Sequence, residues 1–255
     1  MANIELGTVP TWFDVRGDGD PVVLLHGGFV DSRTFAAALP LLISRFQVYR
    51  MDRRGHGHTP DVPGPLSYAA LAADLVAFLE RVVGGPAHLV GHSDGANLAL
   101  RVALERPDLV RRLVLISGNH HVDGVLPGVL DGFEDEAAMA YLAAKHGEVS
   151  PDGEEHFPEL ARKVIELGRN EPSYTDGDLA GVAARTLVMA GDDDMITLEH
   201  TIAQYRAIPD AELAIVPGTS HLLVVEKPEL VYRLVGEFLG TDPVPTRQPA
   251  RRAGR

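Results

Sequence analysis

The chain has 255 residues, which is enough for one large α/β domain or two small ones. Its formal net charge of −13 disfavours nucleic acid and anionic membranes as partners, and no apolar run approaches the roughly 20 residues that a membrane span needs. Cysteine is absent, which excludes disulfides, thiolate zinc sites and a cysteine nucleophile. The first residues lack a signal-peptide pattern, so we expect a cytoplasmic protein.

Short apolar runs spaced along the chain predict strands. The opening segment predicts a hairpin on the sheet edge. The runs that follow are rich in Val, Leu and Ile, as expected for strands buried on both faces, and lie at 21–27, 46–52, 87–92, 111–118, 185–191 and 211–218. Each ends in Gly, Asp or His, so polar residues gather at the C-terminal ends of the strands.

Helical patterns alternate with these strands, at 67–85, 95–107, 198–209 and 227–240. This alternation predicts a mostly parallel sheet with helices on both faces. The interval 119–184 has no strand but contains amphipathic stretches at 135–147 and 157–168. We expect it to lie over the C-terminal strand ends, where ligands bind in open α/β sheets.

The last segment, 241–255, is rich in Pro and Arg. Its composition predicts a disordered tail, and an arm that binds nucleic acid or a partner is the alternative.

A strand, the pentapeptide Gly91-His92-Ser93-Asp94-Gly95 and a helix follow one another, which is the arrangement of a nucleophile elbow. Side chains at the two glycine positions would collide with neighbouring backbone in so tight a turn. Ser93 would stand at a helix N-terminus, where negative charge is favoured. The alternative is that Ser93 only caps the helix.

A serine hydroxyl needs a base, and the base needs an orienting acid. Both should arrive on loops at the C-terminal strand ends, in the chain order serine, acid, histidine. The sequence offers an acid within 192–194 and then His221. An exposed loop histidine is the alternative for His221.

From about Asp20 to Leu239 the chain resembles the α/β-hydrolase family, through four motifs: His26-Gly27-Gly28-Phe29, Asp52-Arg53-Arg54-Gly55-His56-Gly57, Gly91-His92-Ser93-Asp94-Gly95, and Gly191-Asp192-Asp193-Asp194 with Gly218-Thr219-Ser220-His221. The resemblance implies an α/β-hydrolase fold with a mostly parallel sheet of about eight strands. Residues 1–118 and 185–240 would form its core and 119–184 a small helical cap.

The resemblance also assigns roles within the site. It selects Asp194 as the acid that orients His221, with Ser93 as the nucleophile. The backbone N–H groups of Gly28 and Asp94 are expected to form the oxyanion hole. Nothing in the sequence suggests a nucleotide, flavin or metal motif, so we expect no cofactor and no metal. A metal at the Asp triplet is the first alternative, but an isolated acidic run lacks a defined ligand set. A metal at His56 and His58 beside Asp52 is the second, but the resemblance implies that this segment is a tight loop after a strand, with glycines that permit the turn.

The Asp94 side chain is an unexpected feature, because its charge would oppose the oxyanion. Three explanations are open. The carboxylate turns away and bonds to protein groups such as His120 and His121 or an arginine. It faces the pocket and binds a cationic substrate, since family members resembling valacyclovir hydrolase also carry Ser-Asp-Gly. In the third explanation, the carboxylate tunes the pH response of His221. This effect could accompany either of the other two.

The expected substrate contacts are Phe29, Asp94, His120 and Met195. The expected function is hydrolysis of a small ester, lactone or related acyl compound through an acyl-enzyme, with a preference for amine-bearing esters if Asp94 binds substrate. The alternatives are a ligand sensor with slow or no turnover, because fold does not settle function, and a C–C bond hydrolase with the same triad.

Overall fold

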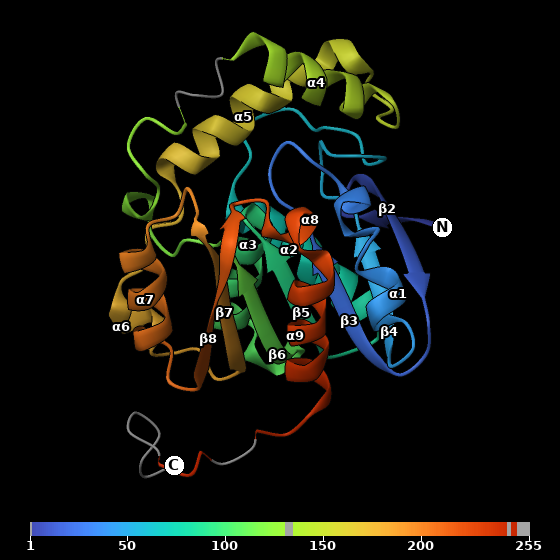
Figure 1. Ribbon diagram of the computed structural model, residues 1–255. Coiled ribbons are helices and arrows are strands. Elements are labelled where there is room, and N and C mark those ends of the chain that lie inside the picture. The colour runs from blue at the N-terminus through green and yellow to red at the C-terminus, as the bar shows by residue number, and fades with distance from the viewer. Residues whose placement is uncertain (1, 131–134, 244–245, 249–255) are drawn as a thin grey trace.

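The computed structural model describes residues 2–130, 135–243 and 246–248, in which one central sheet is flanked by helices (Figure 1). The sheet has eight strands in the order β1-β2-β4-β3-β5-β6-β7-β8. The strands are β1 Ala2–Leu6, β2 Val9–Arg16, β3 Asp20–Leu25, β4 Phe46–Met51, β5 Ala87–His92, β6 Val110–Ile116, β7 Arg185–Asp193 and β8 Ala211–Ser220. Only the β1–β2 and β2–β4 pairs are antiparallel among these strand pairs, so the predicted mostly parallel sheet is confirmed.

Helices cover both faces of the sheet. They are α1 Leu39–Leu42, α2 Tyr68–Phe78, α3 Asp94–Glu105, α4 Glu136–Gly147, α5 Phe157–Asn170, α6 Asp176–Leu179, α7 Leu198–Ala207, α8 Leu223–Glu226 and α9 Pro228–Gly240. The helical pattern over 67–85 ends as an α-helix at Phe78 and continues as a π-helical turn to Val83, where Gly84 terminates it with a positive φ of 83°.

The central strands bury side chains on both sides, as their apolar runs require. In β3, Val23 and Leu25 join the core under α2 and α3, whereas Val22 and Leu24 join the core under α1 and α9. Successive side chains of a strand point to opposite faces, so a strand without polar alternation must lie between two layers.

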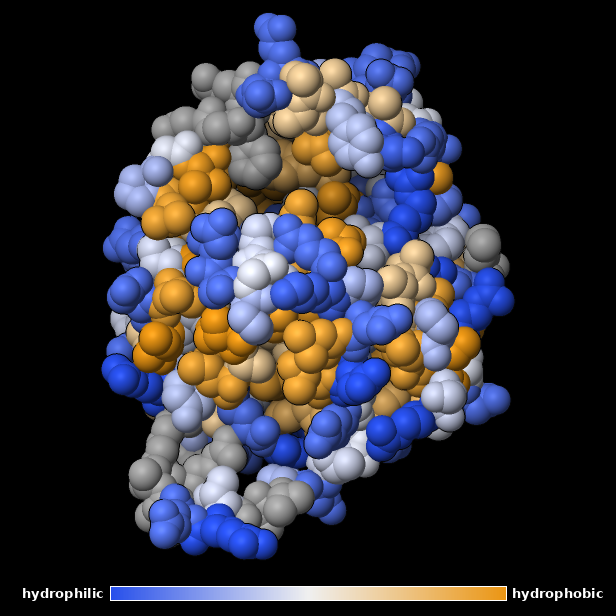
Figure 2. Space-filling view, in the orientation of Figure 1, coloured by the Kyte–Doolittle hydropathy of each residue, from blue (hydrophilic) through white to orange (hydrophobic). Residues whose placement is uncertain are grey.

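The segment between β6 and β7 carries α4, α5 and α6. In Figure 1, α4 and α5 cross above the sheet, apart from the two helix layers. Figure 2 shows a hollow beneath these upper helices, with apolar side chains around it. The segment therefore lies over the edge of the sheet where the predicted site residues gather.

Two predictions concern the ends and the surface of the chain. The tail over 241–255 falls largely outside the described residues, so its predicted disorder stays a prediction. None of the helices in the described part of the chain combines the length and apolar character needed to cross a membrane.

Candidate active site

Ser93 occupies the tight turn between β5 and α3. Its backbone has φ 55° and ψ −124°, a region that residues other than glycine rarely adopt. A Cβ at Gly91 would overlap the Gly95 carbonyl, and one at Gly95 would overlap the Leu25 carbonyl. The Ser93 side chain makes no capping hydrogen bond to α3, so the geometry gives no support to the simple helix-cap alternative.

His221 connects the serine to a carboxylate. Its Nε2 lies 3.0 Å from Ser93 Oγ, and its Nδ1 lies 2.7 Å from Asp194 Oδ1. Because a carboxylate only accepts hydrogen bonds, Nδ1 carries the ring proton in the neutral imidazole. Nε2 is then left with a lone pair that can accept the serine hydroxyl proton.

Asp194 is buried and receives three hydrogen bonds. Besides His221, Ser117 Oγ donates to Oδ2 at 2.5 Å and the Ile196 backbone N–H donates to Oδ1 at 3.0 Å. Burial alone would raise the pKa of Asp194, but the hydrogen bonds from His221 and Ser117 and the charge of His221 hold it below its ordinary value. Sequence reasoning missed Ser117, whose only signal was its position directly after β6.

The other two members of the Asp triplet lie outside this chain of bonds. Asp192 and Asp193 are exposed, and Asp192 Oδ1 accepts the Thr219 backbone N–H at 3.1 Å. Among the described residues, no group of three or more His, Cys, Asp or Glu side chains is placed to hold a metal ion.

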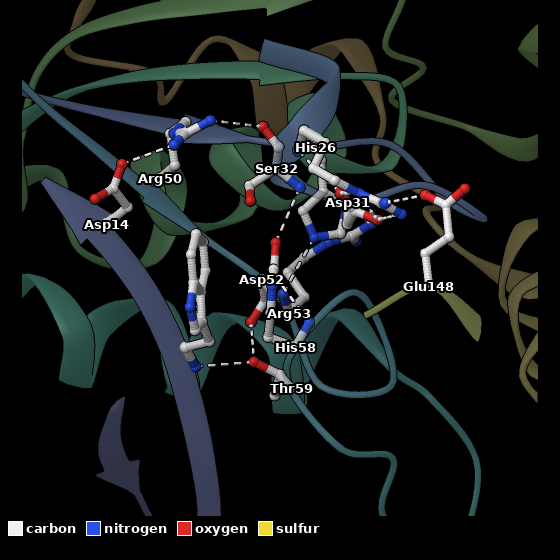
Figure 3. Close-up of polar contacts among 12 residues, drawn as sticks. Asp14, His26, Asp31, Ser32, Arg50, Asp52, Arg53, His58, Thr59 and Glu148 are labelled. Carbon is white, nitrogen blue, oxygen red and sulfur yellow. Dashed lines mark hydrogen bonds and ion pairs between the residues drawn. The ribbon is translucent and has the colours of Figure 1, made fainter. Parts of the chain in front are cut away.

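The loop after β4 is held by buried polar bonds around Asp52 (Figure 3). Asp52 accepts the Ser32 backbone N–H at 2.9 Å and the His58 backbone N–H at 2.9 Å, and its Oδ2 lies 2.8 Å from His58 Nδ1. Although burial would raise the pKa of Asp52, these bonds keep it low. Asp52 and His58 thus hold a loop together, which accounts for their proximity without a metal.

The two glycines after His26 pack against the elbow. A Cβ on Gly27 would lie 3.2 Å from the Ser93 Cβ, and one on Gly28 would lie 2.7 Å from Asp94 Oδ2. Glycine at these positions lets the loop backbone approach Ser93 closely. The predicted oxyanion donors, the N–H groups of Gly28 and Asp94, therefore belong to two segments in direct contact.

The Asp94 carboxylate is held by a tyrosine and lies near an arginine. Oδ1 accepts the Tyr68 hydroxyl at 2.9 Å, and Oδ2 lies 4.0 Å from Nη2 of Arg53. Burial lowers the pKa of Arg53, and the Asp94 charge opposes that shift. The geometry matches the arginine form of the first explanation, whereas His120 and His121 take other partners. The carboxylate nevertheless stays 17% exposed and lines the cavity.

A cavity of about 260 Å³ opens in front of Ser93. Its lining is mainly apolar and includes three of the four predicted contacts, Phe29, Asp94 and Met195. The lining also contains polar residues that the sequence analysis did not single out, namely Tyr68, Asn97, Asn119 and Glu171.

His120, the fourth predicted contact, is not among the residues that line this cavity. Its ring stacks on His200 with centroids 4.0 Å apart, and its backbone N–H donates to His200 Nε2 at 3.1 Å. The preceding residue, Asn119, lines the cavity instead. The cavity therefore takes Asn119 in place of the predicted His120.

A serine, histidine and aspartate bonded in this order at the ends of parallel strands are typical of α/β-fold hydrolases. The chain belongs to the α/β-hydrolase family, whose model matches residues 22–234. The predicted fold and family are thereby confirmed, and the chain is a hydrolase of α/β fold.

Relatives of the chain include enzymes with different substrates. An sn-1-specific diacylglycerol lipase of Mus musculus is 36% identical over 93% of this chain and 87% of its own. A 2-(acetamidomethylene)succinate hydrolase of Mesorhizobium japonicum is 24% identical over 92% of this chain and 94% of its own. Among solved structures, a serine hydrolase involved in carbazole degradation is 25% identical, with a TM-score of 0.77 over 93% of this chain and 97% of its own.

Proposed function

We propose that the protein is a serine hydrolase that cleaves a small carboxylic ester, lactone or related acyl compound through an acyl-enzyme. One observation carries the proposal, namely the unbroken series of hydrogen bonds from Ser93 Oγ through His221 to Asp194 at the wall of a mainly apolar cavity. A serine, a base within hydrogen-bond reach and an acid that orients the base form the arrangement that nucleophilic acyl transfer requires.

In the first step, Ser93 Oγ attacks the substrate carbonyl while His221 Nε2 takes the hydroxyl proton. The carbonyl electrons move onto oxygen, and the N–H groups of Gly28 and Asp94 stabilise that oxyanion. The oxyanion then collapses, and His221 gives its proton to the departing alcohol oxygen. Water then attacks the acyl-enzyme carbonyl while His221 takes its proton. His221 returns that proton to Ser93 Oγ as the oxyanion collapses, and the acid is released. Asp194 keeps the His221 tautomer fixed throughout.

The size and lining of the cavity support a small and largely apolar substrate. Its volume of about 260 Å³ lies below the usual range for drug-sized ligands, roughly 300–1,000 Å³. The amides of Asn97 and Asn119 already bond to each other at 2.8 Å, so they favour a substrate with few polar groups beyond the acyl bond.

We expect no strong preference for amine-bearing esters. Asp94 lines the cavity, but the charge of the buried Arg53 lies 4.0 Å away. A carboxylate with its own cation attracts a substrate amine less than a free carboxylate does.

A labelling and turnover experiment tests the proposal. A fluorophosphonate should attach covalently to Ser93 of the intact protein, and a panel of short-chain aryl esters should be hydrolysed. Ser93→Ala should abolish both, whereas Ser44→Ala, at an exposed serine, should change neither. Labelling without measurable turnover of any acyl substrate would favour the ligand-sensor alternative. Unchanged turnover in Ser93→Ala would exclude Ser93 as the nucleophile.

A further inference from the structure

We infer that Arg53 is a positioning residue for the oxyanion site: it holds the Gly27–Gly28 peptide in place and offsets the charge of Asp94. The inference rests on the proposed function, because it concerns the oxyanion that forms during acyl transfer. Its basis is the position of one guanidinium nitrogen, Nη2, which lies between a loop carbonyl and a carboxylate.

The first contact of Nη2 is with the backbone. Arg53 is only 2% exposed, and Nη2 donates to the Gly27 carbonyl oxygen at 2.7 Å. His26 reinforces this bond. Its Nε2 accepts the Arg53 backbone N–H at 3.1 Å, so the ring proton sits on Nδ1, which donates to the same Gly27 oxygen at 2.8 Å. Figure 3 shows His26 and Arg53 side by side in this network.

His26 keeps this role at ordinary pH. Burial and the nearby Arg53 charge lower the pKa of His26 to about 3, so the ring stays neutral. The Gly27 carbonyl therefore receives two permanent side-chain donors.

Fixing this carbonyl also fixes the proposed oxyanion donor. The Gly27 carbonyl and the Gly28 N–H belong to one planar trans peptide, so they point in opposite directions and rotate together. Two consecutive glycines leave that peptide free to rotate unless something holds it. A donor on the carbonyl also polarises the peptide, which strengthens the hydrogen bond that its N–H can give.

The second contact of Nη2 is electrostatic. Asp94 Oδ2 lies 4.0 Å from it, and a Cβ on Gly28 would lie 2.7 Å from the same oxygen. The carboxylate thus stands beside the N–H that would bind the oxyanion. At about 6 Å and an effective dielectric of about 20, an uncompensated carboxylate would slow formation of an oxyanion about a hundredfold. Arg53 carries the opposite charge 4.0 Å from that carboxylate and offsets the effect.

The neighbouring Arg54 provides a matched control. It is also paired with a carboxylate, since Nε and Nη2 each donate to Asp74 at 2.7 Å. Within the described part of the chain, Arg54 makes no hydrogen bond or ion pair with Gly27 or Asp94. Substitution at either position removes an arginine and an ion pair from this loop. Only substitution of Arg53 also removes the link to the proposed oxyanion site.

The test compares substitutions at position 53 in two backgrounds. Arg53→Met in the otherwise wild-type chain should lower kcat about a hundredfold and change KM little, because the lost interaction acts only when the oxyanion forms. In the Asp94→Asn background the same substitution should cost less than about tenfold, since no carboxylate remains to be offset. Arg54→Met should keep kcat within about threefold of wild type, because the partner of Arg54 is Asp74 and not a residue of the oxyanion site.

Arg53→Lys covers the case in which Arg53→Met fails to fold, because it keeps the charge but lacks the planar fork of donors. It should lower kcat by about tenfold in the wild-type background, with KM little changed. Equal losses at position 53 in the two backgrounds, or a loss seen only in KM, would overturn the inference. Wild-type kcat in Arg53→Met would do the same. If instead Ser93→Ala retained full turnover, the proposed function itself would fail.

Discussion

Ser117 offers a sharp test of how the Asp194 carboxylate is held, because a second buried serine differs from it in one respect. Ser117 Oγ donates to Asp194 Oδ2 at 2.5 Å. Ser32 is equally buried, at 1% against 2% exposure, but its Oγ has no hydrogen-bond partner among the described residues. Replacing each by alanine removes one oxygen from the interior, yet only Ser117→Ala removes a bond to a charge.

The expected magnitudes follow from that difference. A hydrogen bond to a charged group contributes about 1.5–3 kcal/mol, so Ser117→Ala should lower the free energy of unfolding by that amount. For a chain of this size, each kcal/mol corresponds to roughly 2–4 °C in Tm. Ser32→Ala should change the free energy of unfolding by less than about 0.5 kcal/mol or raise it, because a hydroxyl without a partner is costly to bury.

The pH dependence of the Ser117 effect has a defined sign. The folded-state pKa of Asp194 is lowered, so its bonds stabilise the fold above the unfolded-state value, about 3.8, and this contribution disappears as the pH falls through the folded-state pKa. Removing one donor moves the folded-state pKa of Asp194 upward. The stability difference between wild type and Ser117→Ala should therefore be largest near neutral pH and shrink below about pH 4.

Urea unfolding at several pH values, followed by circular dichroism, measures these differences. Ser117→Ala should keep measurable esterase activity, because His221 and Ile196 still bond to Asp194. Equal losses of stability in the two alanine variants, or a Ser117→Ala effect that does not depend on pH, would refute the role assigned to the Ser117 hydroxyl.

Three further predictions concern the cap, the elbow and the substrate. Lys163→Met should cost about 1.5–3 kcal/mol of unfolding free energy, because it removes the 2.6 Å bond to Asp61 and leaves that carboxylate with the His156 ring at 2.8 Å. Arg162→Met on the same helix should cost less than about 1 kcal/mol, since its ion pair with Glu159 is exposed, and equal melting temperatures would contradict this. Gly95→Ala should destabilise by at least about 3 kcal/mol, since its Cβ would overlap the carbonyl of β3, and a variant that unfolds like wild type in urea would disprove the steric argument. Matched aryl esters with and without an α-amino group should differ in kcat/KM by less than about tenfold, or 1.4 kcal/mol, and a hundredfold preference for the amine would show that Asp94 attracts substrate despite its arginine.

Much of the fold could be predicted because the strands are nearly uniform in character. A run such as Val22 to Leu25, apolar at every position, fits only a strand with a layer on each side, and the helices between such runs leave few ways to order them. The proximity of Ser93, Asp194 and His221 could be predicted for a related reason, since each follows a strand and these strand ends meet at one edge.

The partners of these residues could not be predicted in the same way. Ser117 and Arg53 act through contacts that depend on how adjacent loops pack. Ser117 lies in no motif, and the motif that contains Arg53 does not reveal its contact with Gly27. His120 shows the same limit, because a turn of one residue decides whether a side chain enters the cavity. Local sequence specifies the strand ends, whereas the direction of a side chain beyond a strand end depends on the neighbouring elements.

An acid directly after the nucleophile is tolerable when its charge is already matched within the protein. Asp94 has Tyr68 on one oxygen and Arg53 near the other, and Arg53 in turn bonds to the loop that would bind the oxyanion. An uncharged residue at position 53 would leave the Asp94 carboxylate beside the proposed oxyanion site without its cation. Of the two contacts described, the bond from the Tyr68 hydroxyl would remain. Positions 53 and 94 therefore form one electrostatic unit, and exchange of Arg53 should cost less when Asp94 is exchanged as well.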